Sequence, residues 1–308
     1  MESLLQRKLI VVTGKGGVGK TTVAGALGLL AAQRGLQTIV VEVGEQQHLP
    51  ALLEHPQPPR PGELLALSEH LSSLSIDPDR VLADWLRALG GRMSARVLLS
   101  SSTFQYFVAA APGARELLSL VRVWELAGGG GQAGRSANAD LVILDAPATG
   151  HALGMLRSPR TFETIARVGP IAGQAREVGD LLRDPRRSGY LAVAQGTEMA
   201  VSETLQLREG LRQELGRELD GVVLNGAVAQ RFTEHELRQL AGLRSERAAV
   251  RSAALAARAV HERARLQHNQ AARLRRQGLP VLRVPFVFQA RLDPAAMGTI
   301  AERLSRRL

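Results

Sequence analysis

Gly14 to Thr21 is the segment of the sequence whose residue types could do chemistry most directly. It reads Gly-Lys-Gly-Gly-Val-Gly-Lys-Thr, and this G-x-x-x-x-G-K-T spacing is typical of a phosphate-binding loop. The glycines let backbone N–H groups surround an anion, the Lys20 ammonium would contact the β- and γ-phosphates, and the Thr21 hydroxyl would bind Mg²⁺. The segment therefore predicts a site for a nucleoside triphosphate with Mg²⁺.

Lysine is rare in this chain, which makes its placement informative. Only three lysines stand among the 39 basic residues, and two of them, Lys15 and Lys20, lie inside the octapeptide. An ammonium is a compact point charge that fits into a ring of N–H groups, whereas a planar guanidinium is broader. The use of lysine here indicates that both side chains take part in phosphate binding.

The same glycines allow a second interpretation. Three of them also fit the dinucleotide fingerprint G-x-G-x-x-G, and Glu42 ends the next apolar run, where an acid could bind a ribose. That interpretation gives no role to Lys15, Lys20 or Thr21, while the triphosphate interpretation uses all three. A glycine turn with a purely structural role is the third alternative.

A second segment whose residue types could take part in chemistry begins at Asp145. The apolar run Leu141–Leu144 ends in this acid, and an aspartate at the end of a buried strand holds an Mg²⁺-bound water near the γ-phosphate in phosphate-loop enzymes. The residues that follow, Ala-Pro-Ala-Thr-Gly-His up to His151, are uncommon after such a strand. We expect Asp145 and Thr21 to be the metal-binding pair.

Apolar runs predict the elements that must position these residues. Leu9–Val12 leads into the loop as a buried parallel strand, and apolar residues then recur at helical spacing until Gly35, a C-terminal cap. Longer helical stretches separate six further runs, which predicts an α/β fold with a doubly wound, mostly parallel sheet and ligands at the carboxyl ends of its strands. These runs are Thr38–Val41, Leu71–Ile76, Leu141–Leu144, Leu191–Ala194, Val222–Leu224 and Val281–Val284.

The spacing of the runs also predicts the domain organisation. We expect one domain over residues 1–308, with a helical insertion around 46–138 and further helices around 230–278. Three helical patterns fall in the insertion, namely Asp79–Leu89, Ala95–Phe107 and Ala114–Leu126.

Three helical patterns allow either a structural or a binding role. The apolar stripe of Ala114–Leu126 is core or a client groove, and the arginines of Arg251–Arg276 form a solvated face or a surface for an anionic partner. The last helix, with Ile300 and Leu304 opposite arginines, packs on the sheet or binds a membrane.

Composition narrows the classes of protein. A hydrophobic content of 45% over 308 residues suffices for a large core, and the absence of cysteine excludes disulfides and thiolate metal sites. The net charge is +10, but 3% aromatic residues do not make a base-stacking platform, so nucleic acid is not an expected partner. No run approaches the roughly 20 apolar residues that span a bilayer, and we expect a cytoplasmic protein.

The motifs together resemble one family. Gly14–Thr22 with its extra lysine, Asp145–His151, Glu198–Thr204 and Asn225 look like the arsenite-pump and tail-anchored-protein-targeting ATPases, a branch of the deviant-Walker ATPases. The sequence is most similar to bacterial ArsA-like members of that branch. The resemblance implies a P-loop NTPase fold, ATP and Mg²⁺ as cofactors, and a dimer that closes over the nucleotide.

The resemblance also implies a role for individual residues. Lys15 would reach the partner subunit's nucleotide across a dimer interface, while Lys20 and Thr21 would act within their own subunit. Asp145 would belong to a switch that senses the γ-phosphate, and Asn225 would read adenine. The remaining nucleotide-binding residues would be Gly14, Gly16, Gly17, Val18, Gly19, Thr22, Pro285 and Phe286.

One departure from the family concerns catalysis. Members of the family have an aspartate after the second strand that positions the attacking water, and by strand alignment it falls on Gly44. Glu42 or Glu45 would have to substitute. The missing cysteines likewise exclude arsenite coordination by thiols.

Three functions follow as hypotheses. The first is an Mg²⁺-dependent ATPase that acts as a dimeric switch, in a homodimer or with a related ATPase, and couples its nucleotide state to an unknown protein client or a membrane-associated partner. The second is a nucleotide-gated scaffold subunit with little hydrolysis, in which replacing Gly44 by aspartate would raise turnover. The third is a partition or septum-positioning role on DNA or membrane.

Overall fold

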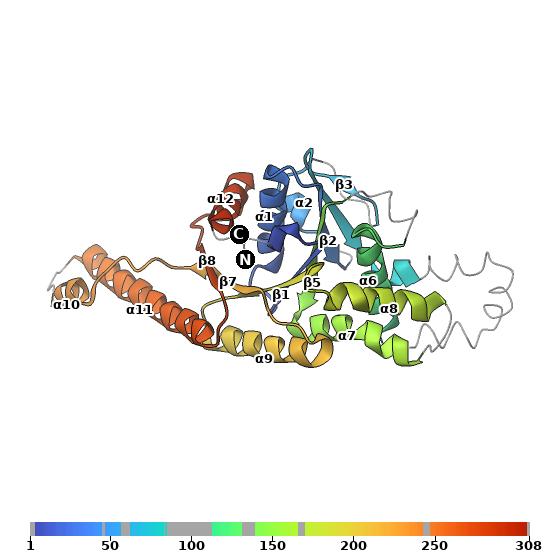
Figure 1. Cartoon of the computed structure of the whole chain (residues 1–308). Helices are drawn as coiled ribbons and strands as arrows, with labels where there is room; N and C mark the ends of the chain where they lie inside the picture. The colour runs from blue at the N-terminus through green and yellow to red at the C-terminus, as the bar shows by residue number, and fades with distance from the viewer. Residues whose placement is uncertain are drawn as a thin grey trace.

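A single eight-stranded sheet organises the chain (Figure 1). The computed structural model describes residues 4–44, 47–56, 62–82, 84, 113–130, 139–165, 170–242 and 247–306. The strand order is β3-β4-β2-β5-β1-β6-β7-β8, and every neighbouring pair is parallel except β3 with β4. The strands are β1 (Leu9–Gly14), β2 (Thr38–Val43), β3 (Leu65–Ala66), β4 (Leu71–Ile76), β5 (Leu141–Ala148), β6 (Ser188–Ala194), β7 (Gly221–Ala227) and β8 (Val281–Pro285).

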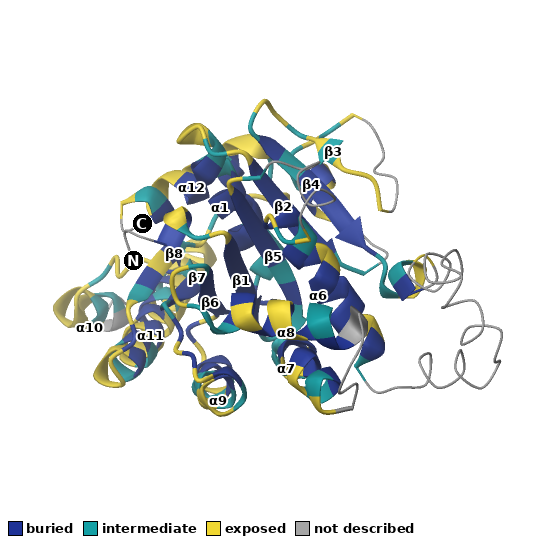
Figure 2. Cartoon of the chain, turned by 45° about the vertical axis from the view of Figure 1, so that its right-hand side comes forward, coloured by how far each residue is buried: buried dark blue, intermediate teal, exposed yellow. Residues whose placement is uncertain are grey.

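Helices cover both faces of the sheet, which confirms the predicted doubly wound α/β fold (Figures 1 and 2). One layer holds α1 (Lys20–Gln33), α2 (Leu49–Leu52) and α12 (Pro294–Ser305), with the short 3-10 helix Leu4–Gln6. The other layer holds α6 (Ala114–Leu126), α7 (Thr149–Ile165), α8 (Pro170–Arg183) and α9 (Glu198–Leu215). Beyond β7, α10 (Glu234–Gly242) and the long α11 (Ala248–Arg276) lie at one end of the molecule.

The alternation of side chains along β1 explains the two layers. Leu9 and Val11 pack into the core beneath α6–α9, while Ile10 and Val12 pack beneath α1 and α12. All four side chains are fully buried, because successive residues of a strand point to opposite faces and both faces are covered. The continuous apolar run seen in the sequence is therefore what a central parallel strand requires.

The sequence predicted several helices correctly. Helix α6 spans the predicted Ala114–Leu126, and its apolar stripe of Leu117, Leu118, Val121 and Leu126 is buried in the core, so the stripe forms no open groove. Helix α1 ends before Gly35, whose φ of 79° is the left-handed conformation of a helix end. Helices α10 and α11 fall within the predicted range 230–278.

The region 46–138 is only partly described. It contributes β4, which pairs in parallel with β2, and the two-residue strand β3, so it includes sheet as well as helix. The predicted helix Ala95–Phe107 and most of Asp79–Leu89 lie outside the described residues, so the helical insertion stays a prediction.

Helix α12 packs inside the fold. Ile300 and Leu304 are buried, and the helix contacts α1 and β8. The structural interpretation of this amphipathic helix is thus confirmed. Among the described residues, no helix combines the length and the apolar character needed to cross a membrane.

Candidate nucleotide site

The loop between β1 and α1 has a backbone that requires glycine at two positions. Gly14 has a φ of 152°, and a Cβ atom there would lie 2.1 Å from the carbonyl oxygen of Val193 on β6. Gly19 precedes α1 with a φ of 91°, a left-handed conformation that L side chains rarely adopt. The loop can therefore lie against the sheet and open its N–H groups at the start of α1, where the helix dipole favours an anion.

The two loop lysines have different partners. The Lys20 Nζ atom donates to the Lys15 carbonyl oxygen at 3.3 Å, so this side chain folds over its own loop. Burial lowers the pKa of Lys20, while the nearby Asp145 charge raises it. The Lys15 Nζ atom instead lies 2.7 Å from Glu203 Oε1 and 2.6 Å from Met199 Sδ, both on α9.

Thr21 and Asp145 meet as predicted. The Thr21 Oγ1 atom donates to Asp145 Oδ2 at 2.5 Å, whereas Asp145 Oδ1 is buried without a hydrogen-bond partner. Burial raises the pKa of Asp145 to about 6, with the Glu42 charge adding to the rise and the Thr21 hydrogen bond opposing it. A hydroxyl beside one carboxylate suits Mg²⁺, which takes few protein ligands and keeps water and phosphate oxygens for the others. The unsatisfied Oδ1 atom leaves room for such a ligand.

A cavity of about 350 Å³ opens beside this pair, at the carboxyl ends of β2 and β5. The Glu42 side chain faces it but is already engaged. Its Oε1 atom accepts from the His48 backbone N–H at 2.8 Å and its Oε2 atom from that of Leu49 at 3.2 Å. Glu42 is buried and holds the first amides of α2, so it is not free to bind a ribose. The lining residues are Thr21, Glu42, Val43, Gly44, His48, Asp145, Ala146 and Pro147.

Two other positions bear on the acid that is missing after β2, namely Gly44 and Glu45. Gly44 has a φ of 133°, so an aspartate there would be strained even though the space around it is open. Its carbonyl oxygen accepts a hydrogen bond from the Ser75 hydroxyl. The predicted gain of turnover on replacing Gly44 by aspartate thus meets a conformational cost. Glu45 lies outside the described residues.

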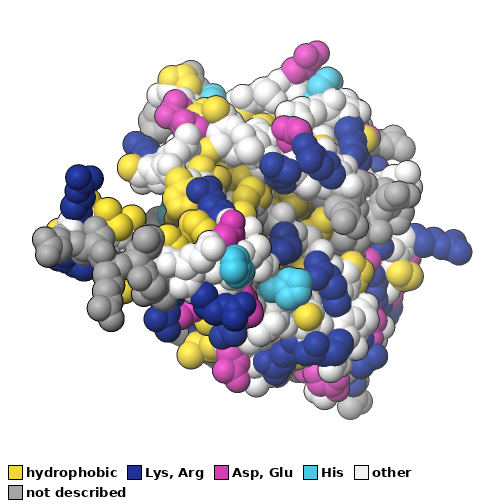
Figure 3. All heavy atoms as spheres, turned by 90° about the vertical axis from the view of Figure 1, so that its left-hand side faces the viewer, with side chains coloured by type: hydrophobic (Ala, Val, Ile, Leu, Met, Phe, Trp, Pro, Cys, Tyr) yellow, Lys and Arg dark blue, Asp and Glu magenta, His cyan; other side chains and the backbone are white. Residues whose placement is uncertain are grey.

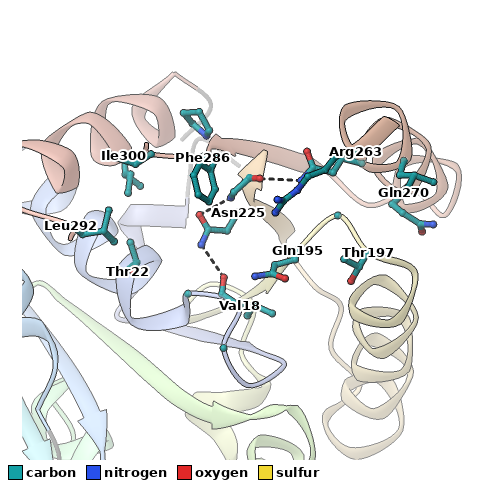
Figure 4. A pocket seen from close by; sticks show the side chains of 18 of the residues that line it. Val18, Thr22, Gln195, Thr197, Asn225, Arg263, Gln270, Phe286, Leu292 and Ile300 are labelled. Carbon is teal, nitrogen blue, oxygen red and sulfur yellow. Dashed lines mark hydrogen bonds between the residues drawn. The ribbon is translucent and has the colours of Figure 1, made fainter. Parts of the chain in front are cut away.

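A second cavity, of about 600 Å³, lies on the other side of the phosphate loop (Figure 4). Asn225, at the end of β7, faces it. The Asn225 Nδ2 atom donates to the Val18 carbonyl oxygen at 2.9 Å, and its Oδ1 atom accepts from the Gly226 N–H at 3.0 Å. Each amide atom can make one more hydrogen bond, which is the arrangement that pairs an asparagine with N6 and N7 of adenine.

Gly19 and the Asn225 side chain are in close contact, so a larger residue at position 19 would collide with the amide. A Cβ atom on Gly19 would lie 2.2 Å from Asn225 Nδ2. The glycine at the start of α1 therefore also makes room for the Asn225 amide.

Aromatic and arginine side chains border this cavity. Phe286 is 44% exposed and its ring contacts Phe288 edge to face at 4.9 Å, while the Arg263 guanidinium lies 5.9 Å from the Phe286 ring. Pro285 also lines the cavity. On this side of the molecule apolar side chains gather among basic ones (Figure 3). A flat, apolar base would find a stacking surface here.

Gln267 is a site residue that sequence reasoning missed. From α11 it donates through Nε2 to the Gly226 carbonyl oxygen at 3.0 Å and accepts through Oε1 from the Val228 N–H at 2.7 Å. Its backbone passes so close to Gly196 that a Cβ atom there would lie 3.0 Å from the Gln267 Cα atom. The sequence held one signal for this residue: Gln267 is a polar side chain among the alanines that form the buried side of α11.

The segment after Asp145 is divided between two elements. Strand β5 continues to Ala148 and α7 begins at Thr149. Gly150 and His151 are exposed on α7 and line neither cavity. The structure therefore brings Lys20, Thr21, Asp145 and Asn225 around one loop but not His151.

Comparison with known proteins agrees with this fold. The sequence model of the anion-transporting ATPase family matches residues 7–171, more than half of the chain, so the chain belongs to this family. It is 27% identical over 258 residues to ATPase BagA of Mycobacterium tuberculosis, covering 81% of this chain and 74% of that protein. It is 29% identical over 160 residues to ATPase ASNA1 homolog 1 of Paramecium tetraurelia (51% and 45% covered), and 28% identical over 179 residues to ATPase GET3 of Chaetomium globosum (56% and 50% covered). The protein is an ATP-binding ATPase.

Proposed function

We propose that the protein is an Mg²⁺-dependent ATPase that works as a dimeric switch. The observation that carries this proposal is the hydrogen bond between Thr21 and Asp145, which leaves one buried carboxylate oxygen open beside the phosphate loop. Thr21 and Asp145 would hold Mg²⁺, which when bound would neutralise charge on the phosphates. The loop lies between the two cavities, so one nucleotide can occupy both.

The placement of ATP follows from the two cavities. The base would lie against Phe286 with the Asn225 amide on its edge, and the phosphates would follow the loop from Gly14 to Thr21. The γ-phosphate would then enter the cavity beside Asp145, and Lys20, now folded over its own loop, would turn to the phosphates. Residues that line the base cavity near the loop include Gly17, Val18, Gly19, Thr22 and Pro285.

Lys15 supports the dimeric part of the proposal. Its ammonium contacts Met199 and Glu203 on α9 rather than the phosphate loop of its own subunit. We assign it to the nucleotide of a partner subunit, either a second copy of this chain or a related ATPase. Closure of the dimer would then change the surface offered to a protein client or a membrane-associated partner.

A nucleotide-gated scaffold is the second candidate function. Two observations favour it: Gly44 offers no side chain to the cavity beside Asp145, and Glu42 is engaged with the start of α2. In this case MgATP would bind and control association, with little turnover.

The test is Mg²⁺-dependent ATP hydrolysis by the purified protein, measured beside Lys20→Ala and Lys15→Ala together with light scattering to give the association state. For the switch ATPase we expect MgATP to bind and to produce a dimer, and turnover to fall by at least about 100-fold in both variants. Binding and dimerisation without turnover would select the scaffold. A protein whose association state is indifferent to MgATP would refute both.

A further inference from the structure

His48 is a side chain of the cavity beside Asp145 to which no role has yet been given. It begins α2, and its backbone N–H donates to Glu42, which fixes the residue at the edge of the cavity. The imidazole is exposed, and it lines the same cavity as Asp145 and Glu42. It makes no capping bond to its own helix, and within the described chain no hydrogen bond to the ring is found.

Hydrolysis of a terminal phosphate needs a water molecule held in line with the bond that breaks. A side chain with an available hydrogen-bond acceptor can hold it. The two acids of this cavity already serve other partners, since Asp145 Oδ2 accepts from Thr21 and the Glu42 oxygens accept from the backbone N–H groups of His48 and Leu49. The other Asp145 oxygen is the one assigned above to Mg²⁺. Among the described residues that line the cavity, His48 adds a ring acceptor without a hydrogen-bond partner.

We propose that the His48 imidazole accepts a hydrogen bond from the attacking water and orients it, an inference that rests on the ATPase function proposed above. In that step the water oxygen bonds to the γ-phosphorus as the bond to the β–γ bridging oxygen breaks. ADP leaves with that electron pair, and the water proton passes to a γ-phosphate oxygen. Glu42 is then a positioning residue, because its two hydrogen bonds fix the start of α2 and with it His48.

The first experiment compares His48→Ala and His48→Gln with the wild-type protein. We expect kcat to fall on the order of 100-fold in His48→Ala, with KM and the affinity for a fluorescent ATP analogue changed less than about threefold. The amide of His48→Gln can accept the same hydrogen bond, so it should recover roughly tenfold of the loss. His235→Ala, on the distant α10, is the matched control and should behave as wild type.

A second readout does not depend on turnover. ADP with beryllium fluoride mimics bound ATP and needs no oriented water, whereas ADP with tetrafluoroaluminate mimics the transition state and requires it. We expect His48→Ala to trap ADP with beryllium fluoride as well as wild type does, and to lose trapping with tetrafluoroaluminate.

Three results would overturn the role of His48. One is wild-type turnover in His48→Ala, above all if Glu45→Gln abolishes it, since that result would assign the water to Glu45. Another is loss of both trapped complexes in His48→Ala, which would mean a structural defect. The third is an equal loss in His48→Gln and His48→Ala without any recovery. If the wild-type protein neither binds nor hydrolyses MgATP, the ATPase mechanism itself fails, which is a distinguishable outcome.

Discussion

The buried Asp145 carboxylate is available as a ligand, and its burial lowers the stability of the folded protein. Its carboxylate is buried next to Glu42, with one oxygen bonded to Thr21 and the other unsatisfied. Burial raises its pKa to about 6, and burial also raises the pKa of Glu42. A cation bound at the open oxygen would offset this cost, because it favours the ionised form.

The raised pKa makes the stability of the free protein depend on pH. Because the folded-state pKa of Asp145 lies above the unfolded value, the folded protein binds the proton more tightly, and stability is lost as pH rises from about 4 through about 6. We expect Asp145→Asn to be more stable than wild type by roughly 2 kcal/mol at pH 8, with little difference at pH 4. Urea unfolding at both pH values, without nucleotide, measures this. Asp140→Asn, with a more exposed carboxylate, is the control, and an equal stability of Asp145→Asn and wild type at pH 8 would contradict the prediction.

The sequence predicted the site residues that belong to motifs. Lys20, Thr21 and Asp145 were predictable because a fixed spacing after an apolar run places them at strand ends. The partners that come from helices were not. Glu203 falls inside the Glu198–Thr204 segment of the resemblance, but that segment does not mark it as the contact of Lys15, and nothing local marks Gln267 as the contact of β7. His48 belongs to none of the sequence motifs, so the sequence did not mark it.

At the scale of elements, the junction of β1 and α1 is tightly constrained. Gly19 adopts a left-handed conformation and lies against the Asn225 side chain of β7. Elements with long apolar runs or stripes, such as β1 and α6, could be predicted from the sequence. The two-residue β3 and the four-residue α2 could not, because they are too short for a hydrophobic repeat to show in the sequence.

We expect Gly19→Ala to destabilise the free protein by about 2 kcal/mol. The left-handed backbone costs an alanine about 1 kcal/mol, and the new Cβ atom must also displace the Asn225 amide from Val18. Gly16→Ala is the matched control within the same loop, since its Cβ atom meets nothing within 4 Å, and it should stay within about 0.5 kcal/mol of wild type. Thermal unfolding of the two variants without nucleotide makes the comparison, and equal melting temperatures would refute it.

At the scale of the whole molecule, Lys15 links the loop to α9. Its ammonium lies against Glu203, so in the proposed dimer it would have to leave that partner to reach the nucleotide of another subunit. The pair is about one-third exposed on both sides, and such pairs contribute little to stability. Its effect should therefore appear in association rather than in folding.

We expect Glu203→Gln to dimerise in the presence of a non-hydrolysable ATP analogue at a protein concentration about three- to tenfold lower than wild type, because Lys15 is no longer held. Sedimentation velocity over a range of protein concentrations measures this. Glu209→Gln removes an exposed carboxylate from the same helix, which contacts Arg212 and Gln213, and should leave association unchanged. Weaker association of Glu203→Gln would instead place this carboxylate in the interface.

The tie between Gln267 and the end of β7 has a mechanical consequence. Helix α11 begins about 19 residues before Gln267, so its start lies roughly 28 Å along the axis from that tie. A tilt of about 10° at the tie would move the start of the helix, and α10 before it, by roughly 5 Å. A small tilt of α11 at Gln267 would therefore become a larger displacement at the far end of the helix, which lies at one end of the molecule (Figure 1).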